Sequence, residues 1–306
     1  MLTCDSYLSP ATLEEAFEAM AANAGRYRLV AGATDILPWA REGRAGDVHI
    51  PVLIDVAGIP ELNRREVENG KVRLGAATPF QRFIDNKALM AALPVMPFVA
   101  VWFADDQIRE SATIGGNLVN ASPAADGTPP LLAHDAEVLL AARRNGTIHH
   151  RKLALSKFVE GPGRTALGED EILLEVQCAA LPKHGAAFEK VGQRRSLVIS
   201  TVCVAALVEL DDTNRKLADV RLAVAGIGPV PRRMDKIEAA LKGQMPSARL
   251  LEDAAAIAGD LVASRTRQEY RREVVRGFVL RALVNAARRA GANDQLITPE
   301  LEALYA

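Results

Sequence analysis

Short apolar runs typical of buried strands alternate with capped amphipathic helices in the first half of the chain. Residues 27–31, 52–56 and 72–76 are apolar runs of strand length. Thr12 and Glu15 form a capping-box pattern ahead of an apolar face at helical spacing, which predicts a helix there. Strands that alternate with helices require a sheet covered by those helices. We therefore expect α/β or α+β packing.

A second helix start is predicted further along the chain. Thr78 is expected to cap this helix, with Pro79 at its first position and Gln81 closing the capping box. Residues 137–142 and 172–176 again have the apolar composition of strands. No repeat or low-complexity tract interrupts the pattern.

The character of the sequence changes near residues 182–186, where a domain boundary is expected. Two β-rich runs follow, residues 198–210 and 217–226, separated by a hairpin turn at residues 211–214. From about Arg232 the chain is predicted to be helical. Residues at helical spacing are expected to form the apolar face of the last long helix, with its arginines in solvent: Tyr270, Val274, Phe278, Ala282 and Ala286.

Size and charge limit the possible functions. The 306 residues leave room for about two domains. A formal net charge of −1 gives no general attraction to nucleic acid or to an anionic membrane. No apolar run is long enough to span a bilayer, and the first residues lack the features of a secretory signal. We therefore expect a cytoplasmic protein that does not bind nucleic acid.

The three cysteines, Cys4, Cys178 and Cys203, are widely separated. They form no CxxC motif and no disulfide framework. Reduced thiols in or near the core are expected, and no metal or iron–sulfur site is expected in this chain.

Two glycine-containing segments, residues 29–35 and 113–117, are candidate ligand loops. Glycine has no Cβ, so the backbone can approach a ligand and successive amides can converge on a phosphate oxygen. No Lys or Arg lies between Ala112 and Asp126, so neutral donors would hold an anion at the second segment. A plain turn is the alternative interpretation of each segment taken alone.

A conventional dinucleotide fold is not expected. No GxGxxG motif links a strand to a helix, and no GxxxxGK[ST] motif is present. Gly226 and Gly228 superficially resemble a phosphate loop, but Pro229 and Pro231 prevent the helix that should follow. This segment is interpreted as the exit of a hairpin.

The two loops together, residues 31–35 and 112–117, resemble those of the FAD-binding medium subunit of xanthine dehydrogenase and carbon monoxide dehydrogenase. The first loop of that family usually reads A-G-G-T-[DN]-[LI], and here Ala33 replaces the second glycine. Further matching patches extend the resemblance to about residue 290; they lie at residues 72–78, 171–174, 188–192 and 269–272.

The resemblance implies an α+β fold. Residues 1–180 would form a two-subdomain FAD-binding domain of the PCMH (vanillyl-alcohol oxidase-like) type, with subdomains at about 1–58 and 59–180. Residues 181–290 would form a C-terminal domain like that of carbon monoxide dehydrogenase flavoprotein, with a small antiparallel sheet and helices. Residues 291–306 would be a tail.

The resemblance also implies the residues that bind FAD. In the first loop these are Leu29, Val30, Ala31, Gly32, Ala33, Thr34, Asp35 and Ile36, around the pyrophosphate. In the second they are Thr113, Gly115, Gly116, Asn117, Asn120, Ser122 and Asp126, of which Asp126 would accept hydrogen bonds from cofactor hydroxyls. Ile172 and Leu173 would offer backbone contacts.

Two residues are implied to act on the flavin itself and are the catalytic candidates. Phe103 corresponds to an aromatic residue against the isoalloxazine, with core packing as the alternative. Lys190 corresponds to a cation that stabilises the negative charge of the reduced ring, with a surface lysine as the alternative.

The resemblance finally implies partners. A small subunit with two [2Fe–2S] clusters and a large subunit with the molybdenum cofactor would assemble with this chain, as a dimer of heterotrimers. Electrons would pass through FAD to NAD⁺ or another acceptor. Residues 122–126 resemble the xanthine dehydrogenase branch more than the carbon monoxide branch, which favours xanthine or another N-heterocycle as the substrate of the complex. The alternatives are a self-sufficient FAD-dependent oxidase and a non-enzymatic nucleotide-binding regulator.

Overall fold

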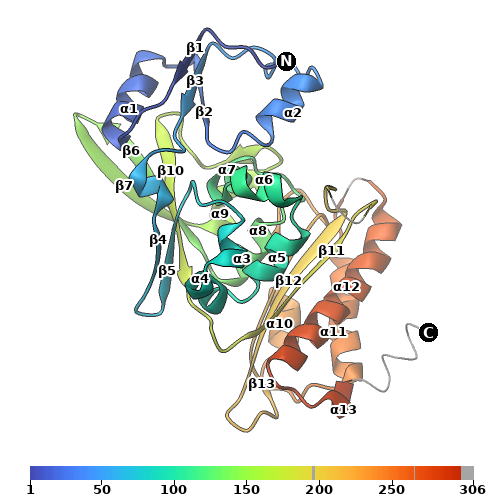
Figure 1. The fold of residues 1–306 in the computed structure, drawn as a ribbon. Coiled ribbons are helices and arrows are strands. Elements are labelled where there is room, and N and C mark those ends of the chain that lie inside the picture. Colours follow the sequence, from blue (N-terminus) through green and yellow to red (C-terminus); the bar gives the residue numbers. More distant parts are fainter. Residues whose placement is uncertain (195–196, 265, 298–306) are drawn as a thin grey trace.

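The computed structural model describes residues 1–194, 197–264 and 266–297. Sheets of three, five and four strands follow one another along the chain, and each is accompanied by helices (Figure 1). A two-stranded ribbon, β8 (Val159–Gly161) with β9 (Arg164–Thr165), lies between strands of the second sheet in sequence. This mixture of helices and strands confirms the predicted α+β class. Of the tail at 291–306, residues 298–306 lie outside the described residues.

The first sheet is parallel, with β3 (Val52–Asp55) between β1 (Ser6–Leu8) and β2 (Tyr27–Val30). The predicted helix is α1 (Leu13–Ala22), and the Thr12 side chain accepts a hydrogen bond from the Glu15 amide as expected. The buried face of α1 is the predicted apolar one, formed by Leu13, Ala16, Phe17 and Met20.

The second sheet is antiparallel. Its strand order is β4 (Arg65–Glu68), β5 (Lys71–Gly75), β10 (Glu171–Ala179), β6 (Glu137–Arg144) and β7 (Thr147–Ala154). Short helices fill the long connections around it: η1 (Pro60–Asn63), α3 (Arg82–Asp85), α4 (Lys87–Ala92), α5 (Met96–Trp102), α6 (Asp106–Ser111), α7 (Ile114–Val119), α8 (Thr128–Ala133) and α9 (Leu155–Phe158).

The helix start predicted at Thr78 is wrong. Helix α3 begins at Arg82, and Pro79 instead pairs with Thr113 in an isolated antiparallel bridge. Among the described residues the buried Thr78 hydroxyl has no hydrogen-bond partner, so it caps nothing. The local capping pattern is overridden because this extended segment is needed to hold the start of the second glycine loop. The Thr78 carbonyl accepts from the Ile114 amide at 2.9 Å.

The third sheet is antiparallel, in the order β11 (Gly185–Val191), β12 (Val202–Leu210), β13 (Leu217–Ala225) and β14 (Arg232–Arg233). The turn at 211–214 joins β12 to β13 as predicted, although β12 begins at Val202 and not at 198. Helices α10 (Asp235–Leu241), α11 (Ala248–Asp260) and α12 (Gln268–Arg289) pack beside this sheet, and α13 (Asp294–Ile297) follows (Figure 1). Arg232 and Arg233 form the short edge strand, so the helical part starts at Asp235.

The predicted apolar face of α12 is correct except at its start: Ala282 and Ala286 are buried, and Val274 and Phe278 pack partly buried against the core. Tyr270 is 48% exposed, and the buried face centres on Val275, Val279 and Leu283. Its arginines do not all face solvent: Arg289 lies over the Phe98 ring at 4.2 Å. Long arginine stems can cover apolar surface while the guanidinium reaches a polar partner. The helix therefore contacts α5 of the middle part as well as its own sheet.

The described residues contain no helix that combines the length and apolarity needed to cross a membrane. All three cysteines are free, and Cys178 and Cys203 are buried as expected. No cluster of three or more metal-binding side chains is found within residues 1–194, 197–264 and 266–297.

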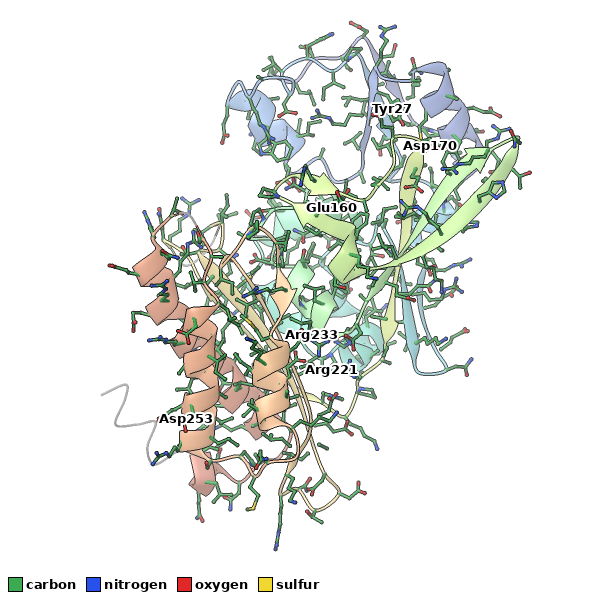
Figure 2. The ribbon with its side chains drawn as sticks, turned by 180° about the vertical axis from the view of Figure 1, so that it is seen from behind. Tyr27, Glu160, Asp170, Arg221, Arg233 and Asp253 are labelled. Carbon is green, nitrogen blue, oxygen red and sulfur yellow. The ribbon has the colours of Figure 1, made fainter. Side chains whose placement is uncertain are left out.

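The loop before β10 joins the first sheet to the second. The Tyr27 hydroxyl donates to the Glu169 carbonyl at 2.5 Å, and Figure 2 shows Tyr27 close to Asp170. Glu171 anchors the same loop: its carboxylate accepts from the Arg151 guanidinium at 2.5 and 2.6 Å and from the Gly168 amide at 2.7 Å. Glu171 is 5% exposed. The hydrogen bonds from Arg151 are the main cause of its lowered pKa.

Glu171→Gln is expected to lower the free energy of unfolding by about 1–3 kcal/mol at neutral pH, because a buried charge-assisted network loses its anion. The folded pKa of Glu171 lies below its ordinary value of 4.5, so its contribution is present above that pH and is lost as the pH falls through the folded pKa. Denaturant unfolding of both proteins from pH 7 to pH 3 should show the difference narrowing. Glu160→Gln, at an exposed position shown in Figure 2, is the control. A constant difference across this range would contradict the assignment.

Candidate functional site

The two glycine loops predicted from sequence meet in space. Gly32 lies so close to the end of α6 that a Cβ would stand 2.0 Å from the Ser111 carbonyl oxygen and 3.1 Å from the Cα of Ala112. The Asn120 side-chain amide donates to the Asp35 carboxylate at 2.9 Å. Eighty-five residues separate Asn120 from Asp35 in sequence. The pair of loops therefore forms one continuous surface from two sheets.

The first loop connects β2 to the short helix α2 (Ile36–Arg41). Within the part of the chain that the structure describes, the amides of residues 32–35 donate to no protein acceptor. Ala33 has a φ of 55°, in the left-handed region that glycine occupies freely. An alanine in this conformation costs about 1 kcal/mol relative to the glycine usual in the family pattern. Consecutive free amides in such a turn are suited to a phosphate group.

The rest of the first-loop candidates support this turn. Leu29 and Val30 end β2, and Ala31 is half-buried after it. Ile36 is buried at the start of α2 and packs with Ile50 and Leu53. The Ile36 side chain is therefore structural, whereas the backbone of this segment, the half-buried Thr34 side chain and the exposed Asp35 side chain are available to a ligand.

The second loop is held by its own hydrogen bonds. The Thr113 hydroxyl accepts from the Gly116 amide at 3.0 Å, which caps α7. Gly115 packs against the sheet, since a Cβ there would lie 2.6 Å from the Ala76 carbonyl oxygen. A Cβ on Gly116 would meet only the Thr113 hydroxyl within 4 Å. Gly115 therefore fixes the helix, whereas Gly116 leaves open space beside it.

The segment after α7 folds back on the same helix. The Asn117 side-chain oxygen accepts from the Gly127 amide at 3.2 Å, and Ser122 accepts from the Ala124 amide at 3.3 Å. These two bonds shape residues 122–127 into the tight loop that ends at Asp126.

Asp126 forms a buried ion pair with Lys190 of β11, at 2.5 Å between Oδ2 and Nζ. The two side chains are only 9% and 5% exposed. The Ser200 hydroxyl donates to the other carboxylate oxygen at 2.6 Å. Cys203 lies beside this group, and burial raises the pKa of its thiol well above the ordinary value. Lys190 is therefore not a surface lysine. Asp126 accepts from two protein donors, and its role toward cofactor hydroxyls stays a prediction.

The remaining site candidates, Phe103, Ile172 and Leu173, pack against other parts of the protein. Phe103 is half-buried and stacks on Phe80, with ring centroids 3.9 Å apart and planes within 3°. Ile172 and Leu173 have buried side chains in β10, just before a register shift. Contact of Phe103 with a flavin, and of Ile172 and Leu173 with any part of the cofactor, stay predictions.

Sequence reasoning missed Ser111 and Ser200. Neither residue lies in a recognisable motif, and each reaches the site through a partner far away in sequence. Ser200 is buried, at 4% exposure, and its partner Asp126 is 74 positions away. A buried serine near a predicted site loop has no local signature.

Comparison with known proteins decides the family. Residues 3–181 match the family described as the FAD binding domain in molybdopterin dehydrogenase. Residues 186–286 match the carbon monoxide dehydrogenase flavoprotein C-terminal domain. The chain belongs to this family of FAD-binding dehydrogenase subunits. The resemblance inferred from the two loops is confirmed.

Individual relatives agree over almost the full length. This FAD-binding subunit is 30% identical over 297 residues to the xanthine dehydrogenase FAD-binding subunit of Escherichia coli O157:H7, covering 95% of this chain and 98% of that one. It is 27% identical over 239 residues to the carbon monoxide dehydrogenase medium chain of Hydrogenophaga pseudoflava, covering 78% and 80%. A solved structure of carbon monoxide dehydrogenase from that organism, lacking the Mo-pyranopterin moiety, aligns with a TM-score of 0.85 at 26% identity, over 94% and 99% of the chains.

Gly32→Ala is expected to weaken FAD binding about tenfold or more, equivalent to about 1.4 kcal/mol or more, because a Cβ facing the Ser111 carbonyl forces the loops apart. Fluorescence titration of the FAD-depleted protein with FAD measures the effect. Gly58→Ala is the matched control, since no atom lies within 4 Å of a Cβ at Gly58 and its φ is not left-handed. Equal FAD affinity in Gly32→Ala and the wild type would show that the loops need not touch.

Proposed function

We propose that this chain is the electron-transfer subunit of a multi-subunit, xanthine dehydrogenase-like molybdenum hydroxylase. It would receive electrons from [2Fe–2S] clusters on a small partner subunit and deliver them to NAD⁺ or another acceptor. Bound FAD supplies the redox centre for this transfer. Family membership over both segments and the names of the relatives support the proposal.

The observation that carries the proposal is the direct contact between the two loops. The free amides of residues 32–35 are suited to the pyrophosphate of FAD, and the backbone contact between Gly32 and Ser111 fixes them relative to the second loop. The open side of Gly116 leaves space for the cofactor next to Thr113 and Asn117. Both loops use neutral donors, as the sequence predicts for the second one.

Lys190 is proposed to place a positive charge near the flavin ring. The Asp126 carboxylate holds the Lys190 ammonium group in position, and the Ser200 hydroxyl donates to the other oxygen of that carboxylate. A buried ammonium without a carboxylate partner would be strongly disfavoured, and Asp126 supplies that counter-charge. Phe103, supported by Phe80, is proposed to pack against the isoalloxazine.

The division of the chain is part of the same proposal. Residues 1–180 would carry FAD between subdomains 1–58 and 59–180, and residues 181–290 would form the C-terminal domain. The organic substrate would be transformed on a large molybdopterin subunit, in a cytoplasmic dimer of heterotrimers. The sequence of residues 122–126 favours xanthine or another N-heterocycle as that substrate.

The isolated chain is expected to bind FAD non-covalently, because neither loop contains a His or Cys for attachment. It should be yellow and should release FAD into the supernatant on acid precipitation. Alone, it should oxidise no purine, aldehyde or N-heterocycle, but it should pass electrons from NADH to an artificial dye. The same organic substrates should turn over when the complex purified from native cells is assayed. Turnover by the isolated chain would instead favour a self-sufficient FAD-dependent oxidase.

Lys190→Met is expected to lower the free energy of unfolding by about 3–5 kcal/mol, because it leaves Asp126 buried and unpaired. The double variant Asp126→Asn/Lys190→Met should recover most of that loss. At saturating FAD, the reduction potential in Lys190→Met should fall by about 30 mV or more, equivalent to about 1.4 kcal/mol for a two-electron couple. Lys190→Arg, which keeps the charge, should retain the potential. Spectroelectrochemistry and denaturant unfolding separate the two effects, and an unchanged potential in Lys190→Met would place the lysine away from the flavin.

A further inference from the structure

Arg271, in the first turns of α12, reaches the ends of two strands of the third sheet. Its guanidinium donates from one nitrogen to the carbonyls of both Thr201 and Gly226, and from another to the Thr266 carbonyl at 3.0 Å. In Figure 1 the start of α12 lies at the end of the sheet where β11 and β12 are joined. One side chain therefore ties the helix to the entry of β12 and the exit of β13.

Both carbonyl acceptors belong to segments that hold the second FAD loop. The Gly226 amide donates to the Pro123 carbonyl at 2.8 Å. Ser200, next to Thr201, donates to Asp126 at 2.6 Å. Arg271 is thus linked through Gly226 to one end of residues 122–126 and through Ser200–Thr201 to the other.

A third link runs to the lysine of the ion pair. The Thr201 amide donates to the Val191 carbonyl at 2.8 Å, directly after Lys190. Displacement of Thr201 would therefore disturb Lys190 through the neighbouring Val191 and Asp126 through the neighbouring Ser200.

The carbonyl groups of Thr201 and Gly226 need a hydrogen-bond donor. Gly226 has a φ of 84°, and a Cβ on it would stand 2.2 Å from the Thr201 carbonyl oxygen. Two carbonyl dipoles thus converge where neither has another protein donor among the described residues. The guanidinium satisfies both carbonyls from one nitrogen while a second nitrogen donates to Thr266, whereas an ammonium group has no second nitrogen for that bond.

We propose that Arg271 is a positioning residue of the FAD site. By bridging the Thr201 and Gly226 carbonyls, it fixes the positions of the second loop and of the Asp126–Lys190 pair without lying in the site. It acts through these backbone groups and does not itself touch the cofactor. The inference rests on the proposed FAD function of the two loops.

The test compares Arg271→Met, Arg271→Lys and Arg272→Met in the full chain. Arg272 is the exposed neighbour on the same helix and serves as the matched control. For each variant we would measure the FAD dissociation constant, the visible circular dichroism of the bound flavin at saturating FAD, and the melting temperature of the FAD-free protein.

Arg271→Met is expected to raise the FAD dissociation constant about tenfold or more, since two carbonyls lose a charged donor. It should also change the visible dichroism of the flavin that still binds. Arg271→Lys should recover part of the affinity, and Arg272→Met should match the wild type in every measurement.

Wild-type affinity and dichroism in Arg271→Met would overturn the inference. So would a loss of bound FAD that only follows the loss of folded protein, with unchanged dichroism in the folded fraction, because that result describes a purely structural arginine. Failure of the wild-type chain to bind FAD at all would instead overturn the proposed function. The two failures are therefore distinguishable.

Discussion

The contact of Gly32 with the backbone of Ser111 and Ala112 is the constraint on which the site depends. The parallel first sheet directs the end of β2 toward the second sheet. Only a residue without a Cβ lets this segment meet the backbone of Ser111 and Ala112 there. Once they meet, the free amides of residues 32–35 and the open side of Gly116 belong to one surface. The anchored loop before β10 joins the same two sheets through Tyr27 and Glu171. Neither sheet alone carries the candidate site.

Local patterns in the sequence were sufficient for much of the fold. The helix cap at Thr12, the apolar strands and the turn at 211–214 are all short-range signals, and each is found in the structure. Thr78 shows where such signals fail: a cap pattern gives way when a distant segment, the start of α7, bonds to the same backbone. The arginines of α12 are a similar case, because they find partners on other elements that helical periodicity does not reveal.

The candidate site was also predictable from the sequence only in part. Its loops were predictable, because glycine and small polar residues mark them in the sequence. The environment of Lys190 was not, since its partner Asp126 is 64 positions away and Ser200 completes the pair from a third segment. Ala33 is a different case. The substitution looked like a small departure from the family pattern, and Ala33 has a left-handed φ that glycine adopts freely.

The Asp126–Lys190–Ser200 cluster has an evolutionary consequence. The aspartate is encoded in the segment that matches the FAD-binding family, whereas the lysine and the serine are encoded in the segment that matches the C-terminal family. Recombination that exchanged one segment without the other would leave a buried carboxylate or a buried ammonium without its counter-ion. Selection should therefore keep the two segments together in one open reading frame and should make their histories inseparable.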